Sequence, residues 1–148
     1  MSTEEDVRNA SRQFYAALNR MLNGDPGPMA EAWSHGAQVT SLHPMGGREI
    51  GWDAVRGSFG QVAHLASGGK AELKDAIVQV AGDMAYEVGV EHGKVTLGGH
   101  KLAIDHRVTN IYRKEGGAWK IVHHHTDTSP AMLEVLHELQ AHSGSAGR

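Results

Sequence analysis

The order of hydrophobic patterns along the chain restricts its fold more than any other feature of the sequence. In the first 65 residues apolar side chains recur every three or four positions, as at Phe14, Leu18 and Met21, which is the spacing of an amphipathic helix. Strand-like segments then follow at 70–80, 84–92, 102–112 and 119–128. Because no helix lies between these strands to make a parallel crossover, we expect an α+β fold with an antiparallel sheet.

The sequence predicts four helices and one further short strand. Glycine and proline end the helical patterns, and Pro28 suits the first position of a short helix. The first helix is expected to run for about twenty residues, and the others at 29–33, at 52–65 and from 129 onwards. A short strand is expected at 37–42, and residues 43–47 are predicted to form the turn after it.

Length and composition are those of a single domain with its own core. The chain has 148 residues, and we place the domain at 1–141 and a flexible tail at 142–148. A formal net charge of −3, without clustered Lys and Arg, argues against nucleic acid as a partner. The lack of cysteine excludes disulfides and thiolate catalysis. The acidic start and the lack of an apolar run of about 18 residues predict a cytoplasmic protein with no signal peptide and no membrane partner.

The densest group of reactive side chains lies on the last predicted strand. Alternate residues of a strand share one face. Trp119 and Ile121 are large and apolar, so their face is interpreted as the inward one. His123, His125 and Asp127 fall on the same face, towards the mouth of whatever the sheet encloses. A bulge in this strand would reverse the assignment beyond it.

Three interpretations of this group stay open. His123 and His125 could act as a general acid–base pair, with Asp127 setting the tautomer. They could instead share a metal ion, with Asp127 as a third ligand or as the group that orients an imidazole. The structural alternative is that the imidazoles pack against a partner subunit or bond backbone groups. We take His123, His125 and Asp127 as the candidate catalytic residues, expect no cofactor, and name the same three as ligands if a metal is bound.

Candidate ligand-binding residues lie elsewhere in the chain. His43 ends the first strand before a rigid turn and could line a cavity mouth, although packing in the turn is the alternative. Arg107 could meet an anionic ligand, and a tyrosine hydroxyl could donate to a developing oxyanion. A surface ion pair and simple ring burial are the respective alternatives. The candidates are Tyr15, His43, Trp52, Tyr86, Arg107 and Thr109.

Several short motifs, taken together, resemble those of a known family. They are Thr40-Ser-Leu-His-Pro44, Gly51-Trp52, Gly82-Asp-Met-Ala-Tyr86, Arg107-Val-Thr-Asn-Ile-Tyr112 and Gly117-Ala-Trp-Lys-Ile-Val-His-His-His125. With the order of elements, they make residues 4–140 similar to the SnoaL-like branch of the nuclear transport factor 2-like (NTF2-like) superfamily, which includes ketosteroid isomerase homologues. The resemblance implies a cone, in which a strongly curved antiparallel sheet wraps around N-terminal helices and encloses a pocket. It also implies a homodimer across the sheet, whose outer face is expected to carry Val78, Val80, Val88 and Val90.

The resemblance also implies a small-molecule-binding protein. Members of the family isomerise, cyclise, hydrate or dehydrate small apolar molecules, usually without a cofactor. We therefore expect a cofactor-independent isomerase-, cyclase- or lyase-type enzyme that uses His-based proton transfer on a small, mostly apolar molecule. The last strand is also similar to that of the association domain of the calcium/calmodulin-dependent kinase, which implies a non-catalytic ligand-binding or assembly module. The run from His123 to Asp127 further resembles the His-His-His-Ser-Ser of iota-class carbonic anhydrases, which implies hydration of carbon dioxide.

Overall fold

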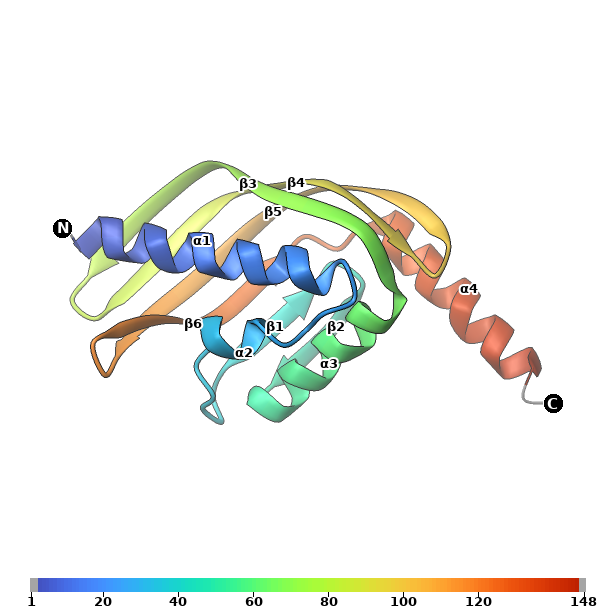
Figure 1. Cartoon of the computed structure of the whole chain (residues 1–148), viewed down its shortest axis with the longest axis horizontal. Coiled ribbons are helices and arrows are strands. Elements are labelled where there is room, and N and C mark those ends of the chain that lie inside the picture. The colour runs from blue at the N-terminus through green and yellow to red at the C-terminus, as the bar shows by residue number, and fades with distance from the viewer. Residues whose placement is uncertain (1–2, 147–148) are drawn as a thin grey trace.

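Helices come first in the chain and long strands second. The computed structural model describes residues 3–146, which form four helices and six strands (Figure 1). In chain order these are α1 (Thr3–Met21), α2 (Met29–Ala32), β1 (Thr40–His43), β2 (Gly46–Ile50), α3 (Trp52–Leu65), β3 (Ala66–Ala81), β4 (Met84–Leu97), β5 (His100–Glu115), β6 (Ala118–Thr126) and α4 (Pro130–Ala146). Each of the four predicted helices is present, and the α+β class is confirmed.

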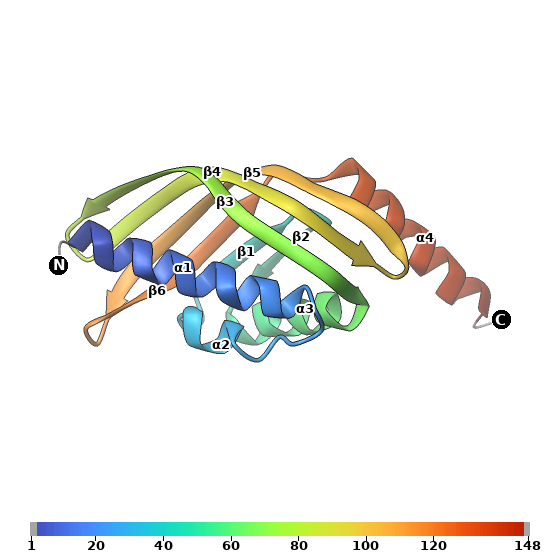
Figure 2. The ribbon, with the colours of Figure 1, turned by 45° about the horizontal axis from the view of Figure 1, so that its top comes forward.

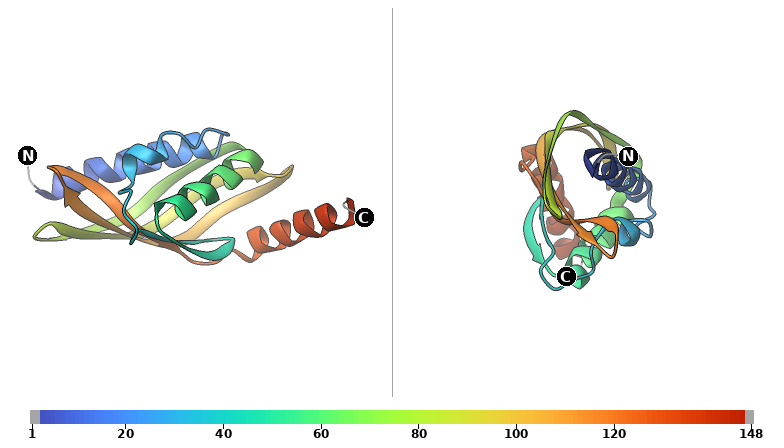
Figure 3. Two further views of the ribbon diagram at one scale, coloured as in Figure 1. Left: turned by 90° about the horizontal axis from the view of Figure 1, so that it is seen from below. Right: turned by 90° about the vertical axis from the view of Figure 1, so that its left-hand side faces the viewer.

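The described strands form one strongly curved sheet. Their order is β2-β1-β6-β5-β4-β3, and every neighbouring pair is antiparallel except β1 and β6, which run parallel. In the end-on view of Figure 3 the sheet curls around α1, and Figure 2 shows α1 lying along its length. The predicted cone of a curved sheet around N-terminal helices is therefore confirmed.

The sheet differs from the sequence prediction at its edge and in the length of its strands. Residues 43–47 were expected to form a turn, yet β2 begins at Gly46 and pairs with β1. The sequence does not indicate this strand, because Gly46, Gly47 and Glu49 are residue types with weak strand propensity. The turn between β4 and β5 consists of Gly98 and Gly99, whose φ angles of 55° and 86° suit glycine, so both strands extend further than predicted.

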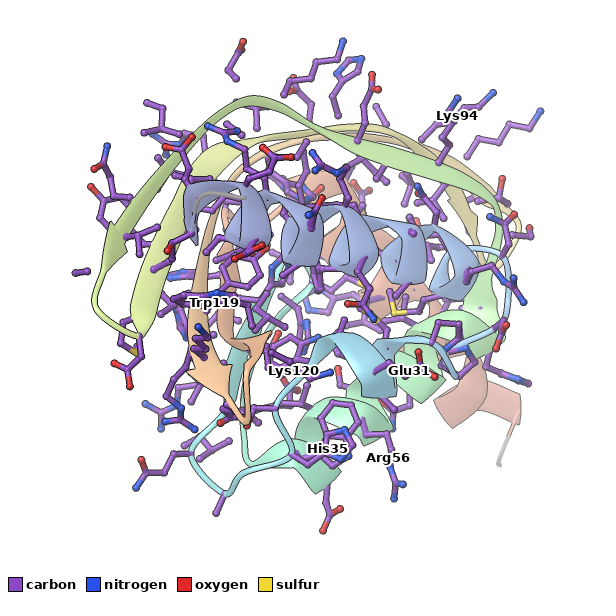
Figure 4. The ribbon with its side chains drawn as sticks, turned by 60° about the vertical axis from the view of Figure 1, so that its left-hand side comes forward. Glu31, His35, Arg56, Lys94, Trp119 and Lys120 are labelled. Carbon is purple, nitrogen blue, oxygen red and sulfur yellow. The ribbon has the colours of Figure 1, made fainter. Side chains whose placement is uncertain are left out.

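The core lies between the helices and the concave face of the sheet. Phe14, Trp33 and Phe59 pack around one another, with ring centroids 6.3 Å and 5.5 Å from that of Trp33. The side-chain amine of Lys120 in β6 donates to the carbonyl oxygen of Glu31 at 2.5 Å, which holds α2 against this strand (Figure 4). Val78 and Val80 were expected on the outer face, but Val78 is 4% exposed and Val80 packs against the core, because β3 changes register near Asp75.

The last helix covers one end of the sheet and then extends beyond the body of the molecule (Figure 1). Met132 and Val135 in its first turns are buried. The helix continues to Ala146, beyond the expected end of the domain at residue 141. Residues 147 and 148 lie outside the described part, and flexibility of the tail stays a prediction. Within residues 3–146, no helix combines the length and hydrophobicity needed to cross a membrane.

Candidate functional site

A β-bulge in β6 decides which histidines face the interior. The pairing with β5 alternates regularly up to Val122, which has no partner and is therefore an extra residue in the strand. Beyond it the two faces exchange, so buried Ile121 is followed on the inside by His124. His123 and His125 lie on the outer face instead. Their predicted interior position is therefore wrong, and the bulge is the physical reason.

The predicted catalytic aspartate is engaged on the outer face as well. The Nε and Nη2 atoms of Arg107 donate to the two carboxylate oxygens of Asp127 at 2.9 Å and 3.0 Å. These hydrogen bonds lower the pKa of Asp127 to about 2. The rings of His123 and His125 lie 6.0 Å apart, and among the side chains described for residues 3–141 no three His, Asp or Glu are grouped as a metal ion would require. The structure thus does not bring His123, His125 and Asp127 together as one site.

A different group of ionisable side chains meets on the inner face. Glu91 of β4, His106 of β5 and His124 of β6 come from three adjacent strands, and each residue is 6% exposed or less. The Nε2 atom of His106 lies 2.7 Å from Oε1 of Glu91, and Nε2 of His124 lies 3.8 Å from Oε2. Burial of such groups costs stability, so a buried cluster of this kind is typical of a functional site. We call these three residues the interior cluster.

A network of hydrogen bonds connects the interior cluster to further buried polar side chains. The Tyr15 hydroxyl donates to Oε2 of Glu91 at 2.9 Å. The Asn110 amide donates to the Tyr15 oxygen and to Oε1 of Glu87, each at 3.1 Å. The Tyr112 hydroxyl donates to the same Glu87 oxygen at 2.8 Å. A second buried carboxylate is thus linked to the first through one amide and one phenol.

The interior cluster faces a small cavity of about 70 Å³. Three of the polar groups that line it are those of the cluster, and a fourth is His43 on β1. The remaining walls are almost entirely apolar and come from α1, α3, the strands, the segment after β1 and α4: Leu18, Met21, Leu22, Pro44, Met45, Phe59, Val62, Ala71, Val95, Leu97, Ile104 and Met132. A cavity needs on the order of 10–15 Å³ to hold one water molecule, so this one has room for a ligand of a few non-hydrogen atoms.

Burial and neighbouring charges set the protonation of the cluster. Burial lowers the pKa of His124 to about 4, although Glu91 acts in the opposite direction. Burial on its own raises the pKa of Glu91, but the hydrogen bond from His106, the nearby His124 and the Tyr15 hydroxyl together hold it below its usual value. Near neutral pH the cavity therefore presents a neutral His124 beside an ionised carboxylate.

Of the predicted ligand-binding residues, two reach this region. His43 lines the cavity, and its Nε2 lies 2.7 Å from a carboxylate oxygen of Glu49. Tyr15 bonds the interior cluster directly. Trp52 is buried, and its ring stacks on that of His35 with centroids 4.4 Å apart. The other three side chains lie on the outer face of the sheet: Tyr86, Arg107 and Thr109.

Sequence reasoning missed Glu91, His106 and Asn110 and assigned His124 to the wrong face. A signal for two of them is present in β5, where His106 and Asn110 alternate with outward residues and share their face with apolar Ile104. A polar residue on an apolar face of a strand is the pattern that would have found them. No comparable signal marks the bulge that turns His124 inward.

Comparison with protein families gives the same architecture. Residues 7–131 match the family described as SnoaL-like domain, which is most of the chain. The chain belongs to the SnoaL-like domain family. No curated protein matches its sequence.

Several solved structures share the fold of this SnoaL-like domain. A proposed dehydratase of the NTF2-like family from Streptomyces avermitilis is 24% identical, with a TM-score of 0.74 over 85% of this chain and 95% of that one. An NTF2-like superfamily protein from Salmonella enterica is 18% identical, with a TM-score of 0.75 over 84% and 89%. A proposed calcium/calmodulin-dependent protein kinase type II association domain from Thiobacillus denitrificans is 24% identical, with a TM-score of 0.64 over 82% and 94%. At these identities the likeness establishes the fold and not the activity.

Proposed function

We propose that this SnoaL-like domain is a cofactor-independent enzyme of the isomerase, cyclase or lyase type, which moves a proton on a small, mostly apolar molecule. The observation that carries the proposal is the interior cluster of Glu91, His106 and His124 beside an apolar cavity. Replacement of a buried ion pair by apolar side chains is often neutral or stabilising, so stability alone does not account for these residues. Ionisable groups with shifted pKa values at the wall of a cavity are what acid–base catalysis requires.

In this proposal His124 accepts the proton. It is neutral near pH 7, and its Nε2 atom lies 3.8 Å from Glu91. When the imidazole takes up a proton, the buried carboxylate stabilises the new positive charge, because charges interact strongly where water is excluded. His106 and Tyr15 hold the carboxylate in place by hydrogen bonds of 2.7 Å and 2.9 Å. The proposed catalytic role therefore passes from His123 and His125 to the histidine between them.

The test measures proton transfer without knowledge of the natural substrate. Small aldehydes and ketones are incubated with the protein in D2O, and NMR records the exchange of hydrogen for deuterium at the carbon beside the carbonyl. We expect at least one compound that fits the cavity to exchange faster than in buffer. His124→Gln and Glu91→Gln should reduce that acceleration by about 10²-fold or more, which is the usual contribution of a positioned acid or base.

Neighbouring residues on the same strand provide matched controls. His123→Gln and His125→Gln change the same residue type on the outer face of β6 and should leave the exchange rate as it is in the wild type. An exchange rate that falls in these variants and not in His124→Gln would restore the assignment made from the sequence. No acceleration with any compound, in a protein whose NMR spectrum shows that the compounds bind in the cavity, would contradict catalysis.

Binding of the compounds without acceleration of exchange would favour a non-catalytic binding module. The small volume of the cavity supports a separate test of one further activity. A volume of about 70 Å³ is enough for carbon dioxide, the substrate that the resemblance to iota-class carbonic anhydrases suggests. Stopped-flow measurement of carbon dioxide hydration decides this alternative. A rate equal to the buffer background would remove it.

A further inference from the structure

Asn110 is fully buried on β5 and uses its whole side-chain amide in hydrogen bonds. Its two N–H groups donate to the Tyr15 oxygen and to Oε1 of Glu87. Its oxygen lies 2.6 Å from Nδ1 of His124, the ring nitrogen remote from the one nearest Glu91. An amide has two N–H hydrogens and one carbonyl oxygen, so each of them has a partner here.

The surroundings of Asn110 permit only one orientation of its amide. Oε1 of Glu87 already accepts a hydrogen bond from the Tyr112 hydroxyl, so it presents an acceptor to Asn110. The Tyr15 hydroxyl gives its hydrogen to Glu91 and offers Asn110 a lone pair. If the amide were turned over, its oxygen would face two acceptors at a site closed to water, which costs about 1–3 kcal/mol for each group left unpaired. The oxygen of Asn110 therefore points at the imidazole.

We propose that Glu87 and Asn110 are positioning residues that keep the proton of neutral His124 on Nδ1, so that a bare Nε2 faces Glu91 and the cavity. An amide oxygen accepts hydrogen bonds only, and Nδ1 must therefore carry the hydrogen. The free histidine side chain favours the opposite tautomer, with the hydrogen on Nε2. Glu87 does not line the cavity, and its effect reaches the ring through Asn110.

This tautomer defines the class of ligand, a step that rests on the proposed function. Nε2 of His124 and Oε2 of Glu91 lie 3.8 Å apart, and with this tautomer both present acceptors. A neutral molecule with an O–H, an N–H or an acidic C–H can meet them. A carboxylate would add a third acceptor to a buried site and would be rejected. The cavity should therefore take small neutral proton donors and exclude the corresponding anions.

The tautomer can be measured directly by 15N NMR on labelled wild-type protein at pH 7 without ligand. The two ring nitrogens give separate signals whose positions depend on which of them carries hydrogen, and His124→Gln identifies the pair that belongs to this residue. We expect a protonated Nδ1 and an unprotonated Nε2. A wild-type His124 with its hydrogen on Nε2 would overturn the proposal by itself, whatever happens in the variants.

Variants test whether Glu87 and Asn110 are the cause. Asn110→Ala removes the acceptor at Nδ1 and should move most of the hydrogen to Nε2. Glu87→Gln places a side-chain amide beside Asn110 that can present either its oxygen or its nitrogen. Asn110 is then no longer held in one orientation, and a measurable fraction of His124 should carry its hydrogen on Nε2. Tyr112→Phe removes the other donor to Glu87 but keeps its carboxylate, so this control should retain the wild-type tautomer. An unchanged tautomer in both Asn110→Ala and Glu87→Gln would overturn the positioning role.

Because the NMR measurement uses no ligand, its outcome is independent of catalysis. The expected tautomer together with no hydrogen exchange on any small compound would retain the positioning role and reject the proposed function. Exchange that depends on His124 in a protein whose Nε2 carries the hydrogen would reject the positioning role alone. The test of ligand class compares the binding of small alcohols or phenols with that of carboxylates of equal size. Preferential binding of the carboxylates would contradict the proposed preference for neutral proton donors.

Discussion

Three consecutive histidines in β6 occupy three different environments. His124 is 5% exposed, His123 is half-buried with its Nδ1 2.6 Å from the Thr40 hydroxyl, and His125 is exposed. The same residue type thus has different properties at adjacent positions, because a strand directs neighbouring side chains to opposite faces. At the scale of single residues, position relative to the bulge and not residue identity determines which histidine lines the cavity.

The pKa of His124 predicts how stability depends on pH. Its value is about 4 in the folded protein and about 6.5 in the unfolded chain. Below pH 6.5 the unfolded chain binds more protons, so the free energy of unfolding should fall as the pH is lowered from 6.5 towards 4, by about 3 kcal/mol from this residue. Urea denaturation at pH 7, 6, 5 and 4 measures this fall in the free energy of unfolding.

A variant isolates this contribution from the other groups that titrate in acid. His124→Gln should lose less stability between pH 7 and pH 4 than the wild type, while His125→Gln should follow the wild-type curve. Equal pH dependence in the wild type and in His124→Gln would show that His124 is not held neutral by burial.

The Tyr15 hydroxyl supports two buried partners at once. Tyr15→Phe should leave Glu91 without one donor and Asn110 without one acceptor, and it should lower the free energy of unfolding by about 1–3 kcal/mol. The matched control is Tyr86→Phe, since the Tyr86 side chain is 48% exposed and its change should stay within about 0.5 kcal/mol. Urea denaturation at pH 7 compares the two, and equal effects would contradict the network.

At the scale of the elements, the sequence predicts more of the fold than of the site. Helical spacing and glycine turns locate α1 and α3 and the long strands, because these signals are local. The edge strand β2 and the parallel pairing of β1 depend on contacts distant in sequence. One unpaired residue, Val122, moves the predicted site from His123 and His125 to His124, since period-two alternation fails at a bulge. Tyr15 and His43 do lie at the interior cluster and the cavity, because their positions do not depend on that strand, and their role in binding a ligand stays a prediction.

The first turn of α4 closes part of the cavity, and Met132 is its contribution to the wall. Met132→Ala should lower the free energy of unfolding by about 2 kcal/mol or more, as truncation of a buried methionine does. It should also admit ligands larger by one or two carbon atoms, seen as NMR shifts at His106 and His124. Leu136→Ala, on the same helix but outside the cavity lining, is the control that should leave ligand size unchanged. Unaltered size selectivity in Met132→Ala would show that α4 does not limit the cavity.

At the scale of the whole molecule, the outer face of the sheet carries apolar side chains. Ile77 and Tyr86 are 55% and 48% exposed, and Val88 and Val90 are half-buried on the same face. Val88 and Val90 line a shallow groove on this face together with Arg107 and His125. Scattered apolar residues are normal on a surface, but a group on one sheet face is typical of an interface.

The homodimer stays a prediction, and substitutions on this face of the sheet can test it. Wild-type protein should sediment as a dimer, and Val90→Asp should shift it to the monomer, because an unpaired charge in an apolar interface is costly. His92→Asp, on the same strand outside the apolar group, should leave the dimer intact. A wild-type monomer at micromolar concentration would remove the prediction.

The parallel pairing of β1 with β6 has a consequence for the order of folding. Thr40 pairs with His123, so the two strands that contribute His43 and His124 are joined only when the chain is nearly complete. Contacts between such distant segments form late and slowly, since the intervening loop must first close. A nascent chain that ends before β6 can form the β3–β4–β5 meander but not the cavity. The wall of the cavity is therefore completed only when β6 joins the sheet, and His124 enters the interior with this strand.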